Sequence, residues 1–261
     1  MNPTELTALV LTYNEAPNLR RTLEQLAWLP DIVVVDSFST DETLAIARSF
    51  PQVRVLQREF DTFAGQCNFG LRQIRTEWVL SVDADYVLTD ALVGELKSLQ
   101  PAGHIAGYTA SFDYCVWGHV LRACLYPPRT VLYRRDRAAY ENDGHAHRVR
   151  VAGELGSLRG RIQHDDRKPL ARWLWAQARY ADQEVAKLAA AQPGQLPLPD
   201  RLRKLIFIAP PLVLLYTLFA RGVILDGWPG LYYAFQRVVA ELILSLKLLE
   251  AKFTERPGGG R

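Results

Sequence analysis

Two aspartates separated by one residue follow an apolar run that is typical of a buried strand. They are Asp83 and Asp85, in the segment LSVDAD at residues 80–85. Two unpaired carboxylates at this spacing would repel each other. A hard cation such as Mg²⁺ or Mn²⁺ removes that repulsion, because it takes few protein carboxylates and completes its shell with water and substrate phosphate. Such a cation would also help a nucleoside diphosphate to depart from a sugar. A purely structural role for the pair is equally compatible with the spacing.

Two further polar clusters also follow predicted strands. The segment TYNE at residues 12–15 follows the first strand, and Asp36 ends the second, in VVVDSFSTD at 33–41. A single aspartate in a loop commonly caps a helix, and Asp41 can be explained in that way. The carboxyl ends of neighbouring parallel strands meet at one edge of a sheet, where open α/β sheets bind ligands. We therefore expect these clusters to form one site.

The elements that must position these residues alternate in hydrophobic period over the first hundred residues. Short apolar runs predict strands, and apolar residues at helical spacing predict helices. Strands are expected at 6–11, 32–35, 53–56 and 78–82, and helices at 15–27, 40–50, 63–75 and 89–99. This alternation favours a parallel sheet with helices on both faces, and right-handed crossovers place the strand C-termini at one edge.

The pattern changes after residue 99. Further strands, of mixed direction, are expected at 105–114 and 130–133, a hairpin within 144–162, a helix at about 169–190 and a linker at 192–199. We divide the chain into a catalytic domain at 1–165, an amphipathic helix and linker at 166–200, and C-terminal helices at 201–252.

The C-terminal segment suggests contact with a membrane. Residues 205–220 carry no charge but are interrupted by Pro210 and Pro211, and residues 231–249 form an amphipathic pattern. A spanning helix needs about 20 apolar residues, so a kinked, re-entrant or interfacial segment is favoured. Trp228 lies between the two stretches, and Tyr232 and Tyr233 stand at the start of the second, as interfacial aromatic residues do. A buried helical hairpin or a dimer interface is the alternative.

Composition excludes several classes of protein. Apolar residues make up 49% of the 261-residue chain, which excludes wholesale disorder. Three cysteines without a CxxC pair exclude a disulfide framework and a zinc motif, and nothing indicates nucleic-acid binding. The N-terminus lacks a signal-peptide pattern, so we expect the catalytic part in the cytoplasm. From residue 122 to residue 179, thirteen Lys or Arg stand against six Asp or Glu, which suggests an anionic partner or a solvated face.

Four motifs together resemble those of family 2 glycosyltransferases with the GT-A fold. They are TYNE at 12–15, DSFSTD at 36–41, NFG at 68–70 and DAD at 83–85, in the family's order and spacing. The resemblance covers roughly residues 5–165 and is greatest to bacterial enzymes that glycosylate the lipopolysaccharide core or other envelope glycans. It implies a Rossmann-like nucleotide-diphospho-sugar transferase fold with a mixed sheet and helices on both faces. It also implies a nucleotide-sugar donor, with UDP favoured, and Mg²⁺ or Mn²⁺.

The resemblance implies a role for each matched residue. The loop of Thr12, Tyr13, Asn14 and Glu15 would border the base and ribose, with Tyr13 stacking on the base. Asp36 would accept a hydrogen bond from the base. In the DAD motif, with Ala84 at its centre, Asp83 would hold the ribose or the metal's water shell and Asp85 would bind the metal. Asn68 and Arg72 would help to seat the nucleotide, although an exposed helix charge explains Arg72 equally well.

The general base is the least determined part of the site. Family 2 enzymes generally invert the anomeric centre in one displacement, which requires a base near the acceptor hydroxyl. Many relatives carry a His-Glu pair after a glycine here, but this chain reads YENDGHAHR at 140–148, without that Glu. Asp143 is our first choice, followed by Glu141, His145 and His147.

Further residues could bind the metal or phosphate. The resemblance suggests His164 as a third metal ligand or a diphosphate contact, and a helix-capping cluster is the alternative. Arg134, Arg148 and Lys168 are candidate phosphate partners, because guanidinium and ammonium groups suit phosphate oxygens.

We therefore predict an inverting transfer of a sugar, such as a hexose, to a lipid-linked or lipopolysaccharide-core acceptor. The enzyme would be attached peripherally or monotopically to the cytoplasmic face of the inner membrane. One alternative is a polyprenyl-phosphate sugar synthase, in which the lipid phosphate is the nucleophile. The other is a non-catalytic nucleotide-sugar-binding scaffold.

Overall fold

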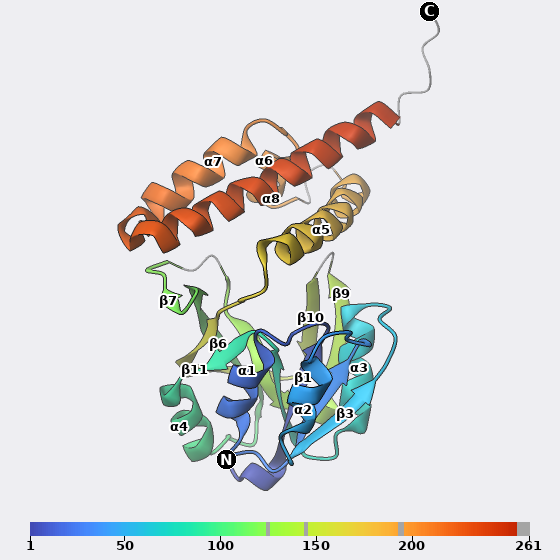
Figure 1. Ribbon diagram of the computed structural model, residues 1–261. Helices are drawn as coiled ribbons and strands as arrows, with labels where there is room; N and C mark the ends of the chain where they lie inside the picture. Colours follow the sequence, from blue (N-terminus) through green and yellow to red (C-terminus); the bar gives the residue numbers. More distant parts are fainter. Residues whose placement is uncertain (124–125, 144–145, 193–195, 255–261) are drawn as a thin grey trace, which may run out of the picture. The chain divides into compact units, whose positions relative to one another are not determined.

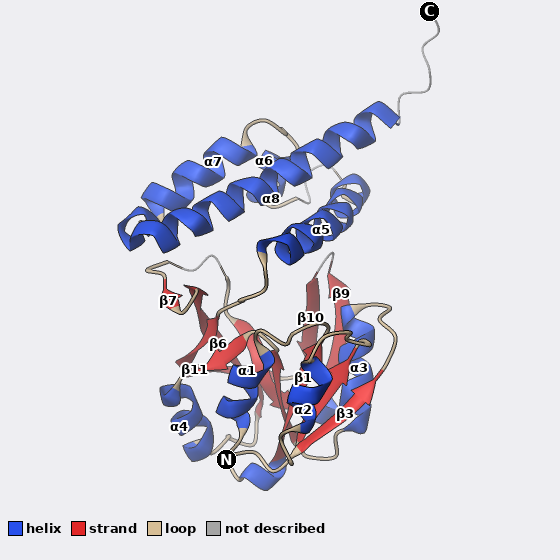
Figure 2. Cartoon of the chain, in the orientation of Figure 1, coloured by secondary structure: helices blue, strands red, loops and turns tan. Residues whose placement is uncertain are grey.

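The computed structural model describes residues 1–123, 126–143, 146–192 and 196–254, and this part of the chain divides into two compact units. The first comprises Met1–Val120 and Cys124–Lys168, and the second Leu121–Ala123 and Pro169–Arg261. The first unit is a mixed α/β structure, and helices make up most of the second (Figure 1, Figure 2).

The described residues of the first unit form a nine-stranded sheet with the order β3-β2-β1-β4-β8-β6-β11-β5, and β7 pairs with β6. The first four of these strands are parallel, β8 runs antiparallel to both of its neighbours, and β6 and β11 are parallel. The mixed direction expected after residue 99 is thus confirmed. The strands are β1 (Leu6–Thr12), β2 (Ile32–Asp36), β3 (Val53–Gln57), β4 (Trp78–Asp83), β5 (Tyr86–Leu88), β6 (Ile105–Val116), β7 (His119–Val120), β8 (Arg129–Arg134) and β11 (Glu154–His164).

Helices cover both faces of the sheet, as predicted, because its central strands are apolar on both sides. Leu6, Ala8 and Val10 of β1 pack with α1, α2 and α4, whereas Leu9 packs with α3 on the other face. The helices are α1 (Leu19–Leu26), α2 (Thr43–Arg48), α3 (Phe63–Gln73) and α4 (Asp90–Ser98), and short 3-10 helices are η1 (Pro3–Glu5) and η2 (Arg135–Arg137).

Two local predictions were wrong, and one strand was missed. The helix expected from residue 15 begins at Leu19, because residues 13–18 form a loop in which Asn14 has a φ of 54°. The hairpin expected within 144–162 is formed by β9 (Ala138–Asp143) and β10 (Ala146–Val151), and the rest of that region is the long strand β11. Strand β5 was not predicted, because three residues are too few to show an alternating pattern.

The second unit is built from helices that pack on one another. They are α5 (Leu170–Ala190), α6 (Leu198–Arg203), α7 (Ala209–Leu215), the π-helical turn η3 (Tyr216–Ala220), the 3-10 turn η4 (Val223–Asp226) and α8 (Gly227–Thr254). Ala181 and Leu188 of α5 pack with Leu244 of α8. Arg203 joins α6 to α8 through Glu241, at 2.9 Å, and also contacts Asp200, at 3.0 Å.

Within the described residues, no helix alone has both the length and the apolar composition required to cross a bilayer. Ala209–Ala220 and Val223–Thr254 meet those requirements only as a pair, and the two segments are bent by 70°. Cys67 and Cys115 are buried and form no disulfide bond within the described residues, and Cys124 lies outside them.

Candidate active site

The predicted polar clusters lie together at the edge of the sheet where the parallel strands end (Figure 1). Thr12 at the end of β1 is in register with Asp36 at the end of β2. Asp83 at the end of β4 is in register with Leu11, one residue before Thr12. Parallel pairing therefore brings together residues that are 24 and 71 positions apart in the sequence.

Side-chain hydrogen bonds join the loop after β1 to the loop after β2. The Asn14 amide nitrogen donates to Ser39 Oγ at 2.8 Å, and Asn14 Oδ1 accepts from the Thr40 amide at the same distance. The Glu15 amide donates to Thr43 Oγ1 at 2.7 Å, and the Ala16 amide to Asp41 Oδ2 at 3.1 Å. The two loops therefore form one connected border, and Asp41 does more than cap a helix. Tyr13 lies on this border and is 38% exposed.

Asp36 is fully buried beneath this border. Its carboxylate accepts hydrogen bonds from Thr12 Oγ1 at 2.9 Å and from the Ser39 amide at 2.9 Å. Asp36 has no exposed surface, so the nucleobase of a donor cannot contact it in this conformation. Asp36 instead fixes the loop after β2, and its predicted contact with the nucleotide remains a prediction.

Asp85 and His164 form a close pair at the same edge. His164 Nε2 lies 3.2 Å from Asp85 Oδ2, and the two side chains are each 13% exposed. Asp85 Oδ1 and His164 Nδ1 are buried and have no hydrogen-bond partner among the described residues. Burial alone would raise the pKa of Asp85, but His164 and Lys168 outweigh it and lower that pKa. Burial alone would lower the pKa of His164, but Asp85 outweighs it and raises that pKa. Asp85 is therefore held as a carboxylate with one free oxygen.

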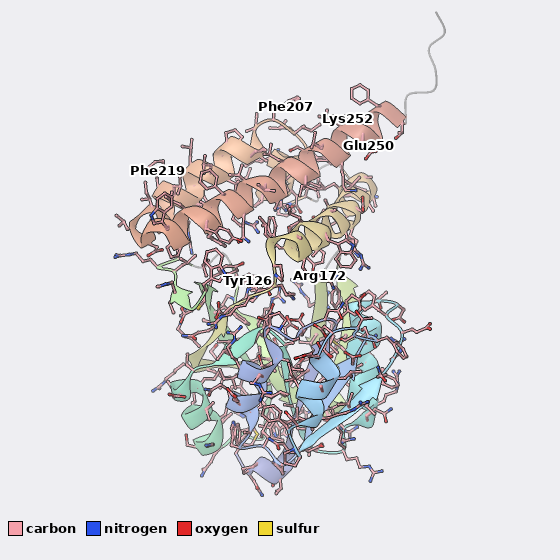
Figure 3. The ribbon with its side chains drawn as sticks, viewed as in Figure 1. Tyr126, Arg172, Phe207, Phe219, Glu250 and Lys252 are labelled. Carbon is pink, nitrogen blue, oxygen red and sulfur yellow. The ribbon has the colours of Figure 1, made fainter. Side chains whose placement is uncertain are left out.

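Three tyrosine rings surround His164. The ring centroids of Tyr114, Tyr126 and Tyr86 lie 4.9, 5.0 and 5.4 Å from that of the imidazole. We call these three residues the tyrosine cage; Tyr126 is labelled in Figure 3. The cage restricts the orientation of the imidazole and hence of Asp85. Sequence reasoning missed these tyrosines, because nothing in their spacing indicates that they meet.

Lys168 contacts the acidic end of the first loop. Its Nζ lies 2.7 Å from Glu15 Oε1 and 3.6 Å from Asp166 Oδ2. Asn18 donates to both Glu15 and Asp166, at 2.9 Å in each case. Burial would lower the pKa of Lys168, but Glu15 and Asp85 outweigh it and raise that pKa. Lys168, which was predicted to contact phosphate, is thus a largely buried cation whose charge is felt at Asp85.

Several predicted residues lie elsewhere. Asn68 holds the hairpin: its side chain donates to the Tyr140 carbonyl at 2.9 Å and accepts from the Tyr140 amide at 3.0 Å. Arg134 is in register with Trp78, where β4 begins, and pairs there with Glu77. Arg72 is exposed in the last turn of α3, shortly before β4 begins. Asn68 thus pairs with β9, and Arg134 pairs at the opposite edge of the sheet. The expected contacts of these three residues with the donor stay predictions.

Three of the four candidate bases, Glu141, Asp143 and His147, lie on β9 and β10. Glu141 is exposed and bonded to Arg150 at 2.9 Å, in the strand pair that also includes Arg148. Asp143 and His147 belong to the paired strands, but their side chains, like all of His145, lie outside what the structure describes. The choice among these residues therefore stays a prediction.

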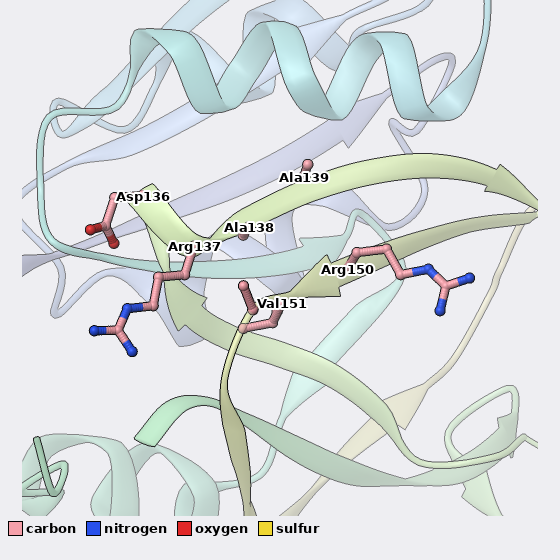
Figure 4. Close-up of a pocket in the computed structure, with 7 residues that line it drawn as sticks. Asp136, Arg137, Ala138, Ala139, Arg150 and Val151 are labelled. Carbon is pink, nitrogen blue, oxygen red and sulfur yellow. The ribbon is translucent and has the colours of Figure 1, made fainter. Parts of the chain in front are cut away.

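A pocket of about 430 Å³ lies at the base of the same hairpin (Figure 4). It is lined by Asp136, Arg137, Ala138, Ala139, Arg150, Val151 and Ala152. The neighbouring Arg135 amide donates to the Glu77 carbonyl, just before β4 begins. The pocket therefore lies at the opposite edge of the sheet from Asp83 and Asp85.

A comparison of the sequence with models of protein families identifies the family of this chain. Residues 7–147 match the family model described as glycosyl transferase family 2, which is more than half of the chain. The chain belongs to this family. It is a glycosyltransferase with the GT-A fold, and the matched region ends inside the hairpin that carries the candidate bases.

Individual proteins similar to this family 2 glycosyltransferase come from bacteria. It is 28% identical to the lipopolysaccharide core biosynthesis glycosyltransferase LpsC of Rhizobium meliloti (strain 1021), over 94% of this chain and 92% of LpsC. It is 32% identical to an uncharacterized glycosyltransferase of Rickettsia bellii (strain RML369-C), over 36% of this chain and 32% of that protein. S. aureus TarS 1–349, solved with UDP-GlcNAc, gives a TM-score of 0.48 at 14% identity, covering 95% of this chain and 92% of that one.

The acidic corner of this family 2 glycosyltransferase suits a small hard cation. Asp85 Oδ1 is buried without a partner, and the half-exposed Asp83 lies two residues away. Among the described residues, no three side chains of His, Cys, Asp or Glu are grouped so that they could hold a metal. Two carboxylates are nevertheless enough for Mg²⁺ or Mn²⁺, which fill their remaining positions with water and substrate phosphate.

Proposed function

We propose that the enzyme moves a sugar from a nucleoside-diphosphate sugar, with UDP favoured, to an acceptor hydroxyl with inversion at the anomeric carbon. One observation carries this proposal: Asp83 and Asp85 meet the loops after β1 and β2 at one sheet edge, with an oxygen of Asp85 unpartnered. Asp85 and Asp83 would hold Mg²⁺ or Mn²⁺. When bound, the cation would neutralise charge on the departing diphosphate.

The chain's own residues position the reactants. His164, fixed by the tyrosine cage, would hold the Asp85 carboxylate in one orientation. Tyr13 would border the base of the nucleotide. A carboxylate or imidazole of the hairpin, with Asp143 first and Glu141, His145 and His147 after it, would take the acceptor proton. The acceptor oxygen then bonds to the anomeric carbon, and the sugar–phosphate bond breaks toward the diphosphate.

We place the acceptor at a membrane. The second unit carries thirteen Lys or Arg against seven Asp or Glu, a net charge of +6, although the whole chain is only +3. Large apolar side chains are exposed on its C-terminal helices and in the turn between α6 and α7: Leu205, Phe207, Ile208, Leu212, Leu215, Tyr216, Phe219, Ile224, Leu225, Trp228, Phe235, Leu242, Leu246 and Phe253. We call this set the apolar surface. The apolar surface could insert among lipid chains, and the net positive charge of the second unit favours the anionic surface of the inner membrane.

The similarity to LpsC supports an acceptor of the lipopolysaccharide-core or lipid-linked class. We propose that the enzyme acts at the cytoplasmic face of the inner membrane, attached peripherally or monotopically.

The test is donor turnover. The full-length protein, incubated with Mn²⁺ and a panel of nucleotide sugars, should hydrolyse or transfer from at least one donor. Asp85→Asn should lower turnover of that donor by about 100-fold or more, because it removes charge next to the departing diphosphate. Asp90→Asn, an exposed change five residues along the chain, is the matched control and should retain activity. Unchanged turnover in the Asp85 variant would contradict the proposal.

A further inference from the structure

Arg129 is a half-buried cation without an acidic partner. Among the described residues, no carboxylate lies within ion-pair distance of its guanidinium, whose one aromatic contact is the Tyr126 ring, with 4.6 Å from the guanidinium carbon to the centroid. A partly buried charge that lacks a counter-ion is destabilising unless a ligand supplies one. The ligand to expect is therefore an anion.

The fold places Arg129 at the active-site edge. Arg129 is the first residue of β8, which runs antiparallel to β4 and β6. The start of β8 therefore lies where β4 ends, toward Asp83. A chain of contacts runs from this position to Asp85: Arg129 stacks on Tyr126, Tyr126 lies 5.0 Å from His164, and His164 is hydrogen-bonded to Asp85.

Arg129 stays charged at this position. Burial would lower its pKa, but Tyr86, Tyr126, Asp83 and Asp85 outweigh burial and raise it. Neither aspartate forms an ion pair with Arg129 in this structure. A metal cation bound by those aspartates would neutralise their charge and leave the guanidinium available to phosphate oxygens. The planar guanidinium can donate two parallel hydrogen bonds to such oxygens.

We propose that Arg129 binds the diphosphate of the nucleotide-sugar donor and stabilises it as the leaving group. This inference rests on the proposed function. As the bond between the anomeric carbon and the phosphate oxygen breaks, the electron pair stays on that oxygen. Arg129 donates hydrogen bonds to the diphosphate and keeps its own protons.

The experiment compares ligands with and without phosphate. Binding of UDP and of uridine to the full-length protein is measured in Mn²⁺, and Mn²⁺ binding is measured separately. Arg129→Ala should weaken UDP binding by roughly 10- to 100-fold, and uridine and Mn²⁺ binding should stay within about twofold. The UDP affinity of Arg129→Lys should lie between that of Arg129→Ala and that of wild type, because lysine keeps the charge but cannot donate two parallel hydrogen bonds. Arg159→Ala removes an exposed charge from β11 and should bind UDP as wild type does.

Three results would overturn the inference. UDP binding unchanged in Arg129→Ala would do so while leaving the proposed function intact. An equal loss of UDP and uridine, or a parallel loss of Mn²⁺, would show that Arg129 acts only on the structure of the site. Wild-type protein that binds no UDP, GDP or ADP would overturn the proposed function itself, and this inference with it.

Discussion

At the scale of single residues, Asp41 shows how one carboxylate stabilises two loops. Burial would raise the pKa of Asp41, but hydrogen bonds from Thr43 and Ala16 outweigh it and lower that pKa. A carboxyl group with a lowered folded pKa contributes stability that is fully present above its unfolded pKa, about 3.9. That stability is lost as the pH falls through the folded pKa.

We therefore expect Asp41→Asn to be less stable than wild type at pH 7, by about 1 kcal/mol because the site is partly exposed. The difference should shrink toward zero as the pH falls through the lowered pKa of folded Asp41. Urea unfolding at several pH values measures it. Glu24→Gln, an exposed change on α1, should show no such trend. A difference between Asp41→Asn and wild type that grows on acidification would contradict the account.

Single residues also show how far the sequence could predict the site. Asp36, Asp83 and Asp85 follow apolar strands, so their common edge follows from parallel pairing alone. Asn68 and Arg134 could not be placed in this way, because their partners are set by tertiary packing. Asn68 contacts Tyr140, which lies 72 positions away, and Arg134 lies on a strand whose direction the sequence does not reveal.

At the scale of elements, the hairpin of β9 and β10 is attached to α3 through Asn68. The two hydrogen bonds between the Asn68 side chain and the Tyr140 backbone resemble the paired hydrogen bonds between two residues of adjacent strands. Tyr140 Oη also donates to Ser81 Oγ of β4 at 2.8 Å. Asn68→Ala removes both main-chain contacts and leaves buried backbone groups unpaired. We expect a loss of about 1–3 kcal/mol in the free energy of unfolding and faster hydrogen exchange in residues 138–141.

The matched control is Gln73→Ala, an exposed change at the end of the same helix. It should leave exchange in the hairpin unchanged. If the hairpin were equally protected in Asn68→Ala and wild type, the proposed attachment would be wrong.

Element boundaries were harder to predict than element types. The strands β1 to β4 contain runs of β-branched or other apolar residues, so each was predicted to within a residue or two. Helix α1 starts later than expected because Asn14 and Asn18 belong to the loop that joins the neighbouring active-site segment. Strand β5 is held by pairing with β11, a long-range contact that leaves no local pattern.

At the scale of the whole molecule, the apolar surface should control attachment to membranes. Phe207 and Phe219, labelled in Figure 3, are 75% and 62% exposed. The double variant Phe207→Glu/Phe219→Glu should weaken sedimentation with anionic vesicles by more than about tenfold, because each buried aromatic ring contributes about 2 kcal/mol. Donor hydrolysis in solution should not change.

The control adds the same charge elsewhere in the unit. Gln183→Glu/Ala189→Glu places two carboxylates at exposed positions of α5, outside the apolar surface. If both double variants bound vesicles equally well, membrane attachment through the apolar surface would be excluded.

The proposed function depends on Asp83 and Asp85 holding the cation that binds the donor's diphosphate. A crystal of the full-length protein grown with UDP and MnCl₂ tests it most directly, since manganese is located by its anomalous signal. We predict manganese bound to Asp85 Oδ1 and to the diphosphate, with Arg129 within hydrogen-bond distance of a phosphate oxygen. UDP bound at another site, with no manganese between Asp83 and Asp85, would show that these aspartates do not form the donor site.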